Sequence, residues 1–107
     1  MELAFETLAL RVACELGEEA RRLYPEPIAN VLLARLADIR CAPAVADLVL
    51  AGMSVDAHPP GRVTFALGDD YGLVCVGNHP RPPVTADGTV DLARLRRLKV
   101  VAIIPKP

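Results

Sequence analysis

Four basic side chains follow one another closely near the end of the sequence: Arg94, Arg96, Arg97 and Lys99. Such a cluster is a candidate RNA contact, because guanidinium and ammonium groups form charge-assisted hydrogen bonds with phosphate oxygens. The chain as a whole has 12 Lys and Arg against 13 Asp and Glu, a net charge of −1, which argues against an affinity that comes mainly from neutralising phosphates. The cluster is therefore interpreted either as an RNA-binding group or as an ordinary solvated face before a strand.

The charge is unevenly distributed along the chain. Up to residue 60 there are five basic and nine acidic residues, a net charge of −4. From residue 61 on, seven basic and four acidic residues give a net charge of +3. The C-terminal part is mildly basic for this reason, and the four-residue cluster supplies most of that charge.

The sequence supports neither a metal site nor a disulfide framework. The three cysteines are odd in number and far apart, with no Cys-x-x-Cys spacing and no His pair nearby: Cys14, Cys41 and Cys75. Asp69 and Asp70 fall in an expected turn, and Asp87 and Asp91 have no third ligand beside them. We expect reduced thiols, with Cys75 as a small core residue, and neither a metal ion nor another cofactor.

Residues 61–76 predict a β-hairpin. Apolar side chains alternate with other residues in two runs separated by Gly68-Asp69-Asp70, with the period of two that strands show: Val63, Phe65 and Leu67, then Tyr71, Leu73 and Cys75. A second apolar run, KVVAII at 99–104, predicts a strand that is buried on both faces and pairs with the hairpin. A two-stranded hairpin is marginal in water, so the upstream residues are expected to cover it.

The upstream residues predict a short strand over 2–5 and then a helical hairpin. Thr7 is placed to cap a helix over 8–23, in which apolar residues recur at spacings of three and four: Leu8, Val12, Leu16, Ala20 and Leu23. Gly17 weakens this helix by up to about 1 kcal/mol relative to Ala, so a break there remains open. A second helix is expected from Pro27 to about Arg40, with the apolar stripe Ile28, Val31, Leu32, Leu36 and Ile39.

The remaining segments predict less regular structure. Pro43 is suited to start a third, short helix over 44–50, and Gly52 to end it. We expect a loop over 53–60, little regular structure in the Pro- and Gly-containing segment 77–91, and a helical turn over 92–98. With 107 residues, of which 52% are hydrophobic, the chain is expected to form one α+β domain with its helical hairpin packed on a small antiparallel sheet.

The N-terminal residues give an expectation about location. MELAFETLALRV carries acidic residues where a secretory signal would carry positive charge. No apolar run approaches the about 18 residues that a membrane span needs. We therefore expect a cytoplasmic protein that does not contact a membrane.

Several motifs follow one another in a characteristic order. They are LARLADIRCAPAVADL at 33–48, a histidine before the sheet (His58), the hairpin strands at 61–67 and 71–76, Asp87-Gly88-Thr89-Val90-Asp91, and the final apolar strand at 100–104. In this order and spacing the chain resembles the RelE/ParE superfamily of toxins, specifically its HigB-like plasmid maintenance killer branch. The resemblance covers nearly the whole chain with one gap, and implies a single RelE/ParE-like domain over residues 1–107.

The resemblance implies the function of a type II toxin–antitoxin toxin. Members of this family cleave messenger RNA on the ribosome, as mRNA interferases, while a helix-turn-helix antitoxin encoded alongside holds them inactive. Such endonucleases position the RNA and activate its 2′-hydroxyl with Lys, Arg, His and Tyr side chains rather than with a metal.

This chain departs from the family pattern at three places that carry that chemistry. The family's Lys- and Arg-bearing loop before the hairpin is shortened here to Pro59-Pro60-Gly61-Arg62. Gly72 stands where the family has the Arg of its Y-R-L-I-F motif, and Pro105-Lys106-Pro107 where the family often ends in D-Y-H.

Three residues remain as catalytic candidates under the resemblance. Arg62 is placed to bind phosphate, or else lies on the solvent face of its strand. His58 suits proton transfer by the range in which imidazoles titrate, or else is an ordinary surface residue. Lys106 supplies a charge but neither a phenol nor an imidazole. His79 has no partner that the sequence identifies, and Tyr71 is expected to pack in its strand rather than to stack on a base.

Two classes of function stay open at this point. The first is a ribosome-dependent mRNA endonuclease, or a catalytically reduced relative of one, with the ribosome, mRNA and a cognate antitoxin as partners. The second is a non-catalytic module of the same fold that binds an antitoxin or associates with itself through the apolar sheet and helical hairpin. The apolar composition, with a mean hydropathy of +0.32, is consistent with a homodimer or an obligate partner.

Overall fold

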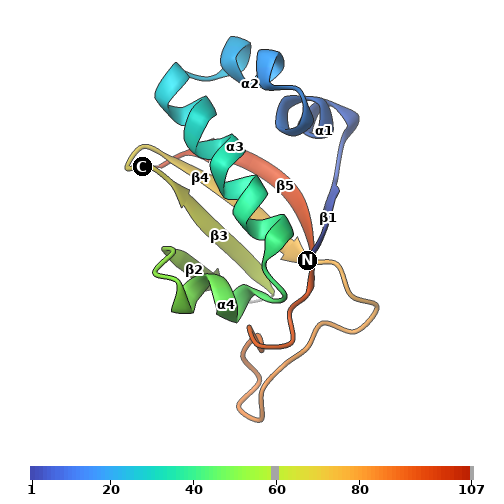
Figure 1. Ribbon diagram of the computed structural model, residues 1–107. Coiled ribbons are helices and arrows are strands. Elements are labelled where there is room, and N and C mark those ends of the chain that lie inside the picture. Colours follow the sequence, from blue (N-terminus) through green and yellow to red (C-terminus); the bar gives the residue numbers. More distant parts are fainter. Residues whose placement is uncertain (59–60, 107) are drawn as a thin grey trace.

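The elements of the chain follow one another as β1 (Glu2–Phe5), α1 (Leu8–Glu15), α2 (Gly17–Leu23), α3 (Glu26–Cys41), α4 (Val45–Leu50), β2 (Val55–His58), β3 (Arg62–Leu67), β4 (Tyr71–Gly77) and β5 (Arg97–Pro105). The computed structural model describes residues 1–58 and 61–106. Its strands form one sheet in the order β1-β5-β4-β3-β2 (Figure 1). None of the helices in the described ranges is long and apolar enough to cross a membrane.

The sheet is mixed, so the expected purely antiparallel sheet is wrong at one edge. β1 runs parallel to β5, with Leu3 beside Leu98 and Phe5 beside Val100, whereas the other three pairs are antiparallel. A parallel pair needs a long crossover connection, and here the whole of α1 to β4 lies between its two strands. The predicted α+β class is confirmed.

The predicted helix over 8–23 is two helices. Thr7 Oγ1 accepts a hydrogen bond from Leu10 N at 3.1 Å and caps α1 as expected. The chain then leaves the helical conformation at Leu16, and α2 starts at Gly17. The expectation that the apolar stripe of this helix is buried is wrong, because Leu8 is 76% exposed and Leu16 is 54% exposed. The small residues Ala13, Cys14 and Ala20 pack inward in their place.

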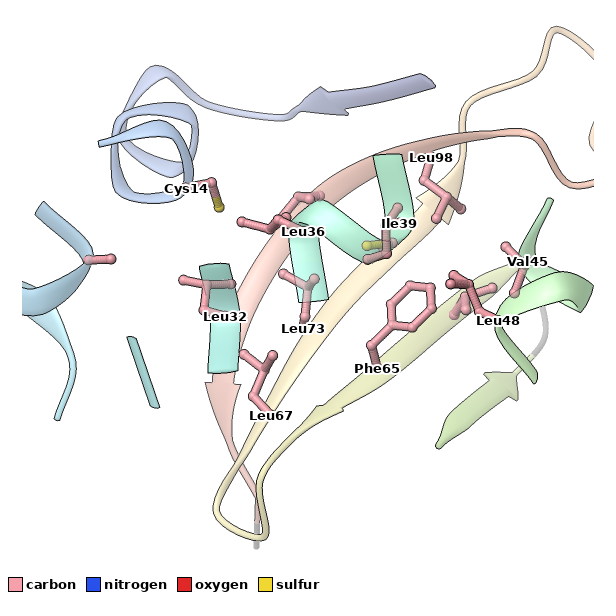
Figure 2. Packing of buried hydrophobic residues seen from close by; sticks show 14 of the residues in the cluster. Cys14, Leu32, Leu36, Ile39, Val45, Leu48, Phe65, Leu67, Leu73 and Leu98 are labelled. Carbon is pink, nitrogen blue, oxygen red and sulfur yellow. The ribbon is translucent and has the colours of Figure 1, made fainter. Parts of the chain in front are cut away.

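The second predicted helix is confirmed as α3. Four of its expected stripe residues are buried: Ile28, Leu32, Leu36 and Ile39. Figure 2 shows Leu32, Leu36 and Ile39 packing against Leu67, Leu73 and other side chains that project from the strands. The amine of Met1 donates to carbonyl oxygens at the end of α3, those of Arg40 at 2.8 Å and Ile39 at 3.3 Å. These oxygens have no partner within the helix, so the amine satisfies groups that a helix end leaves free.

The hairpin over 61–76 is confirmed as β3 and β4. Val63 lies opposite Cys75, Phe65 opposite Leu73 and Leu67 opposite Tyr71. These side chains face the helices, and all of them except the partly buried Tyr71 belong to the same buried cluster as residues of α3 (Figure 2). The expected loop over 53–60 is wrong in part, because residues 55–58 form β2 and extend the hairpin by another antiparallel strand. Four residues are too few for the alternation of Val55 and Ala57 to be recognised as a strand.

The final strand, β5, was expected to be buried on both faces, and the structure shows helices on only one of them (Figure 1). Leu98 and Val100 point into the core and are fully buried. A register shift between Val74 and Cys75 of β4 places an extra residue in β5. On the far side Val101 and Ala102 are only partly covered, and Ile104 is 46% exposed.

Residues 78–96 form an arm that extends from the body of the domain (Figure 1). A β-bridge joins Val84 to Val90 around a turn in which Asp87 accepts hydrogen bonds from Thr85 and Thr89. These hydrogen bonds hold the pKa of the Asp87 carboxyl below its usual value. The helical turn expected over 92–98 is shorter than predicted, since β5 already begins at Arg97.

The base of the arm also caps α4. Val45 N donates to Leu95 O at 3.1 Å, and Ala46 N donates to Leu92 O at 2.9 Å. The first amides of a helix have no partner within the helix, so these two carbonyls complete its N-terminus. The side chain of Leu95 is fully buried and fixes this end of the arm to the core.

The three thiols differ in their surroundings, which predicts different reactivities. Cys14 and Cys75 are buried, and burial raises the pKa of Cys14 to about 11 and that of Cys75 to about 12. Cys41 is exposed. Because the thiolate is the reactive form, we expect one thiol per chain to react rapidly with a disulfide reagent at mildly alkaline pH, and all three in denaturant. Rapid reaction of three thiols in the folded protein would contradict the packing described above.

Candidate functional site

Arg62 and Lys99, which are 37 positions apart in the sequence, come together across the sheet. Arg62 lies opposite Val76 on β4, and Val76 lies opposite Lys99 on β5. Directly opposed residues place their side chains on the same face, and two strand spacings separate their backbones by about 10 Å. Both side chains line one hollow of about 390 Å³. Of the candidate residues whose side chains the structure describes, these two are brought to a common site.

The hollow lies on the face of the sheet that points away from the helices. We call this surface the open face. On the three central strands its hollow is lined by Arg62, Val74, Val76, Lys99, Val101, Ala102 and Ile104, and Thr64, Ala66 and Gly72 lie on the same face by their register. An antiparallel sheet with one face in water usually carries polar side chains there. Between its two cations the open face is apolar instead, which is typical of a surface that another layer covers.

The hollow carries more positive than negative charge. Among its described lining residues, Glu6 is the one carboxylate beside the two cations. Neither Arg62 nor Lys99 forms an ion pair with another residue that the structure describes. Both charges remain available to a bound group as a result. They could hold an anion over Val76, since long Arg and Lys side chains can converge from backbones about 10 Å apart.

Two other members of the basic cluster form ion pairs elsewhere. Arg97 pairs with Glu2 of β1 at 3.1 Å. Arg94 pairs with Asp91 at 2.9 Å and donates to Val84 O at 3.2 Å within the arm. The cluster expected to bind RNA is therefore divided between the arm, the edge of the sheet and the open face, and Lys99 is the member that lies beside Arg62.

Lys106 lies at the opposite end of the sheet. Its backbone N donates to Asp70 O at 2.7 Å, next to the turn between β3 and β4. The pairing of Tyr71 with Pro105 is five residues along β4 from Val76, a separation of about 17 Å. Lys106 is therefore not part of a common site with Arg62.

The backbone of His58 lies in β2, opposite that of Arg62 in β3. The side chain of His58 lies outside the described part of the structure, as do Pro59, Pro60 and Pro107.

Gly72 occupies the position where the resemblance expects an Arg, and it lies opposite Ala66 and Ile104 on the open face. A Cβ atom at Gly72 would lie 3.0 Å from Cγ2 of Thr64.

His79 has a structural role that the sequence did not reveal. Its Nε2 accepts hydrogen bonds from the backbone N of Arg96 at 3.1 Å and of Arg97 at 3.2 Å. The ring joins the two ends of the arm, and to accept these bonds its Nε2 must be unprotonated. No local pattern could have shown this, because the partners are 17 and 18 residues away.

The His79 contact gives a second prediction. His79→Ala should speed the amide hydrogen exchange of Arg96 and Arg97, because both amides lose their acceptor, and should lower the free energy of unfolding by about 1 kcal/mol. Arg81→Ala on the same arm serves as the control. Unchanged exchange at Arg96 and Arg97 would show that the ring does not hold the base of the arm.

A second hollow, between α3 and α4, is less suited to a ligand. It measures about 440 Å³ and is lined in part by Arg35, Asp38, Cys41 and Asp47. Its charged groups are already partnered: Arg35 with Asp38 at 3.4 Å, and Asp47 with the backbone N of Ala44 at 3.1 Å. Throughout residues 1–58 and 61–106, no group of three His, Cys, Asp or Glu side chains is arranged to hold a metal ion.

Comparisons with known proteins add no relative. No family model matches the chain, and neither a curated protein nor a solved structure matches it. The function is therefore argued from the open face and from the sequence motifs.

Proposed function

We propose that the chain is a toxin-like protein of the RelE/ParE type, HigB-like branch, in which the RNA-cleaving chemistry is reduced and binding of a partner protein remains. The partner in this proposal is a cognate helix-turn-helix antitoxin. The motif order of the sequence supports the proposal, and so does the order of elements, in which a first strand and several helices precede a hairpin and a final strand that pairs with both.

The composition of the open face carries the proposal. Cleavage through the 2′-hydroxyl of RNA needs a general base and a general acid within hydrogen-bonding reach of the reacting atoms. The described residues that line the hollow offer two cations, one carboxylate and an apolar floor. Lys106 lies about 17 Å from the cations, and Gly72 leaves the position of the family's Arg without a side chain. Such a surface is better suited to binding than to acid–base catalysis.

Retained nuclease activity is the second candidate. The observation that favours it is that Arg62 and Lys99 lie on either side of Val76 and line one hollow, where two cations could hold a scissile phosphate. Under this alternative His58 would be the group that moves a proton.

Expression of the chain in bacteria separates the two candidates. With reduced chemistry we expect no growth arrest and no cleavage of total mRNA, in the wild type as in Arg62→Ala. Growth arrest that Arg62→Ala relieves would establish the nuclease and overturn the proposal. A small helix-turn-helix protein encoded next to this gene, and its co-purification with the chain, would support the partner named here.

A further inference from the structure

We propose that the open face binds the C-terminal end of an amphipathic helix from the partner protein. In this arrangement Arg62 and Lys99 contact the last carbonyl oxygens and a carboxylate of the helix, and its apolar side chains lie on the floor between Val74 and Ile104. The inference rests on the proposed function, since it states which structural element of the partner occupies the open face.

The central strands carry apolar side chains on both faces of the sheet, and this supports a second covering layer. Apart from Thr64 and Asp56, which lie side by side on β3 and β2, this face of the sheet is apolar from Val76 to Ile104, and an apolar sheet face is commonly buried against another layer of secondary structure. α3 supplies that layer on one face, through Leu32, Leu36 and Ile39 (Figure 2). No helix of the described chain lies over the other face (Figure 1), where Val101 and Ala102 are partly buried and Ile104 is 46% exposed. A second helix there would complete a sandwich of helix, sheet and helix.

The position of the charges indicates which end of the helix lies where. Both cations stand at the Val76 end of the open face, and the apolar floor continues along β4 towards Gly72. The C-terminus of a helix carries free carbonyl groups and a partial negative charge, which cations stabilise. From Val76 to Gly72 the strand covers about 13 Å, which about nine residues of helix would span.

Gly72 adds no side chain to the open face, and its backbone is already buried within the chain. Its neighbours on that face, Ala66 and Ile104, lie on either side of it. A helix would rest on these neighbours, of which Ile104 is 46% exposed, and no long side chain at position 72 would hold it away.

A single-stranded RNA fits this surface less well. Proteins that bind single strands commonly stack bases on aromatic side chains. The chain has two Phe, two Tyr and no Trp, and all four of these residues lie on the helix side of the sheet. Phe65 and Tyr71 face the helices by their register, Phe5 packs against the core cluster, and the rings of Tyr24 and Tyr71 contact each other with centroids 6.0 Å apart.

The test uses a synthetic helical peptide as the probe. It is alanine-based, about sixteen residues long, with leucines at spacings of three and four along one face, and it is made both with a free C-terminal carboxylate and with an amidated C-terminus. Binding to the full chain is measured by calorimetry. We expect saturable binding of the carboxylate form, and binding about tenfold weaker after amidation, because a charge-assisted contact is lost.

Variants of the chain locate the contact. Arg62→Gln and Lys99→Gln should each weaken binding of the carboxylate peptide about fivefold to tenfold, and Arg81→Gln, an exposed arginine on the arm, should leave binding unchanged. Equal binding of both peptide forms, equal losses in all three variants, or no saturable binding would overturn the inference. Dodecanoate is tested in parallel, and its binding in the absence of peptide binding would also overturn the inference, in favour of an acyl chain as the ligand.

These outcomes are separable from those of the growth assay. Growth arrest relieved by Arg62→Ala would remove the proposed function whatever the peptide does. Absence of both arrest and peptide binding would remove the helix as the occupant and leave the reduced chemistry in place.

Discussion

Phe65→Ala is expected to lower the free energy of unfolding by about 3–5 kcal/mol, the cost of removing a large side chain from a packed core. Phe65 is the largest of the fully buried side chains, with 0% exposure. It projects from β3 into the space next to α3 and α4, near Leu48 (Figure 2). Because the ring is fully buried, its removal would leave a cavity in the core. Chemical denaturation followed by circular dichroism measures the effect.

The control for Phe65→Ala is Leu50→Ala in α4. Leu50 is 86% exposed, so its truncation should change the stability by less than about 0.5 kcal/mol. Loss of stability in both variants to the same degree would contradict the assignment of the core to the layer between the helices and the sheet. A change at Phe65 as small as the one at Leu50 would contradict it equally.

Gly72→Arg is expected to abolish binding of the helical peptide, with an affinity at least about tenfold lower than that of the wild type. An arginine there would place its side chain on the open face, where Gly72 lies between Ala66 and Ile104. It would also press on Thr64, since a Cβ atom would lie 3.0 Å from Thr64 Cγ2. The affinity would fall because the arginine side chain fills the surface that the peptide needs, although its positive charge by itself would favour binding of the peptide carboxylate.

A second substitution separates blocked binding from a damaged fold. Thr64→Ser removes the methyl group that a side chain at position 72 would meet, so Gly72→Arg combined with Thr64→Ser should regain thermal stability without regaining peptide binding. Wild-type affinity in the double variant would show that the surface beside Gly72 is not covered by the peptide. The same double variant restores the Arg that the family resemblance expects, and growth arrest on its expression would favour the nuclease.

The elements that the sequence predicts correctly are those with a sustained local period. β3 and β4 have six and seven residues, and α3 repeats its apolar residues over 16 residues. The α1–α2 region shows how a period can mislead. Leu8, Leu16 and Leu23 recur as a buried stripe would, but the break at Leu16 leaves all three exposed while Ala13, Cys14 and Ala20 pack inward. Small residues that allow close packing leave no comparable pattern in the sequence.

The features that the sequence does not reveal depend on pairs of distant residues. The parallel pairing of β1 with β5 joins the two ends of the chain, and the His79 contacts close the base of the arm. The placement of Arg62 and Lys99 beside one hollow requires the register of three strands, which a hydrophobic pattern cannot supply across the 19-residue connection between β4 and β5. The two-sided apolar character of β5 is visible in the sequence, and the structure shows which of its faces this chain leaves uncovered.

Methyl NMR spectra of the chain, recorded with and without the carboxylate peptide, show where the peptide binds. We expect the methyl signals of Val74, Val76, Val101 and Ile104 on the open face to shift on binding. The methyl signals of Leu32 and Leu36, on the opposite side of the sheet, should stay in place. Shifts confined to Leu8, Leu16 and Leu23, the exposed apolar residues of the α1–α2 region, would contradict the claim that the partner binds the open face.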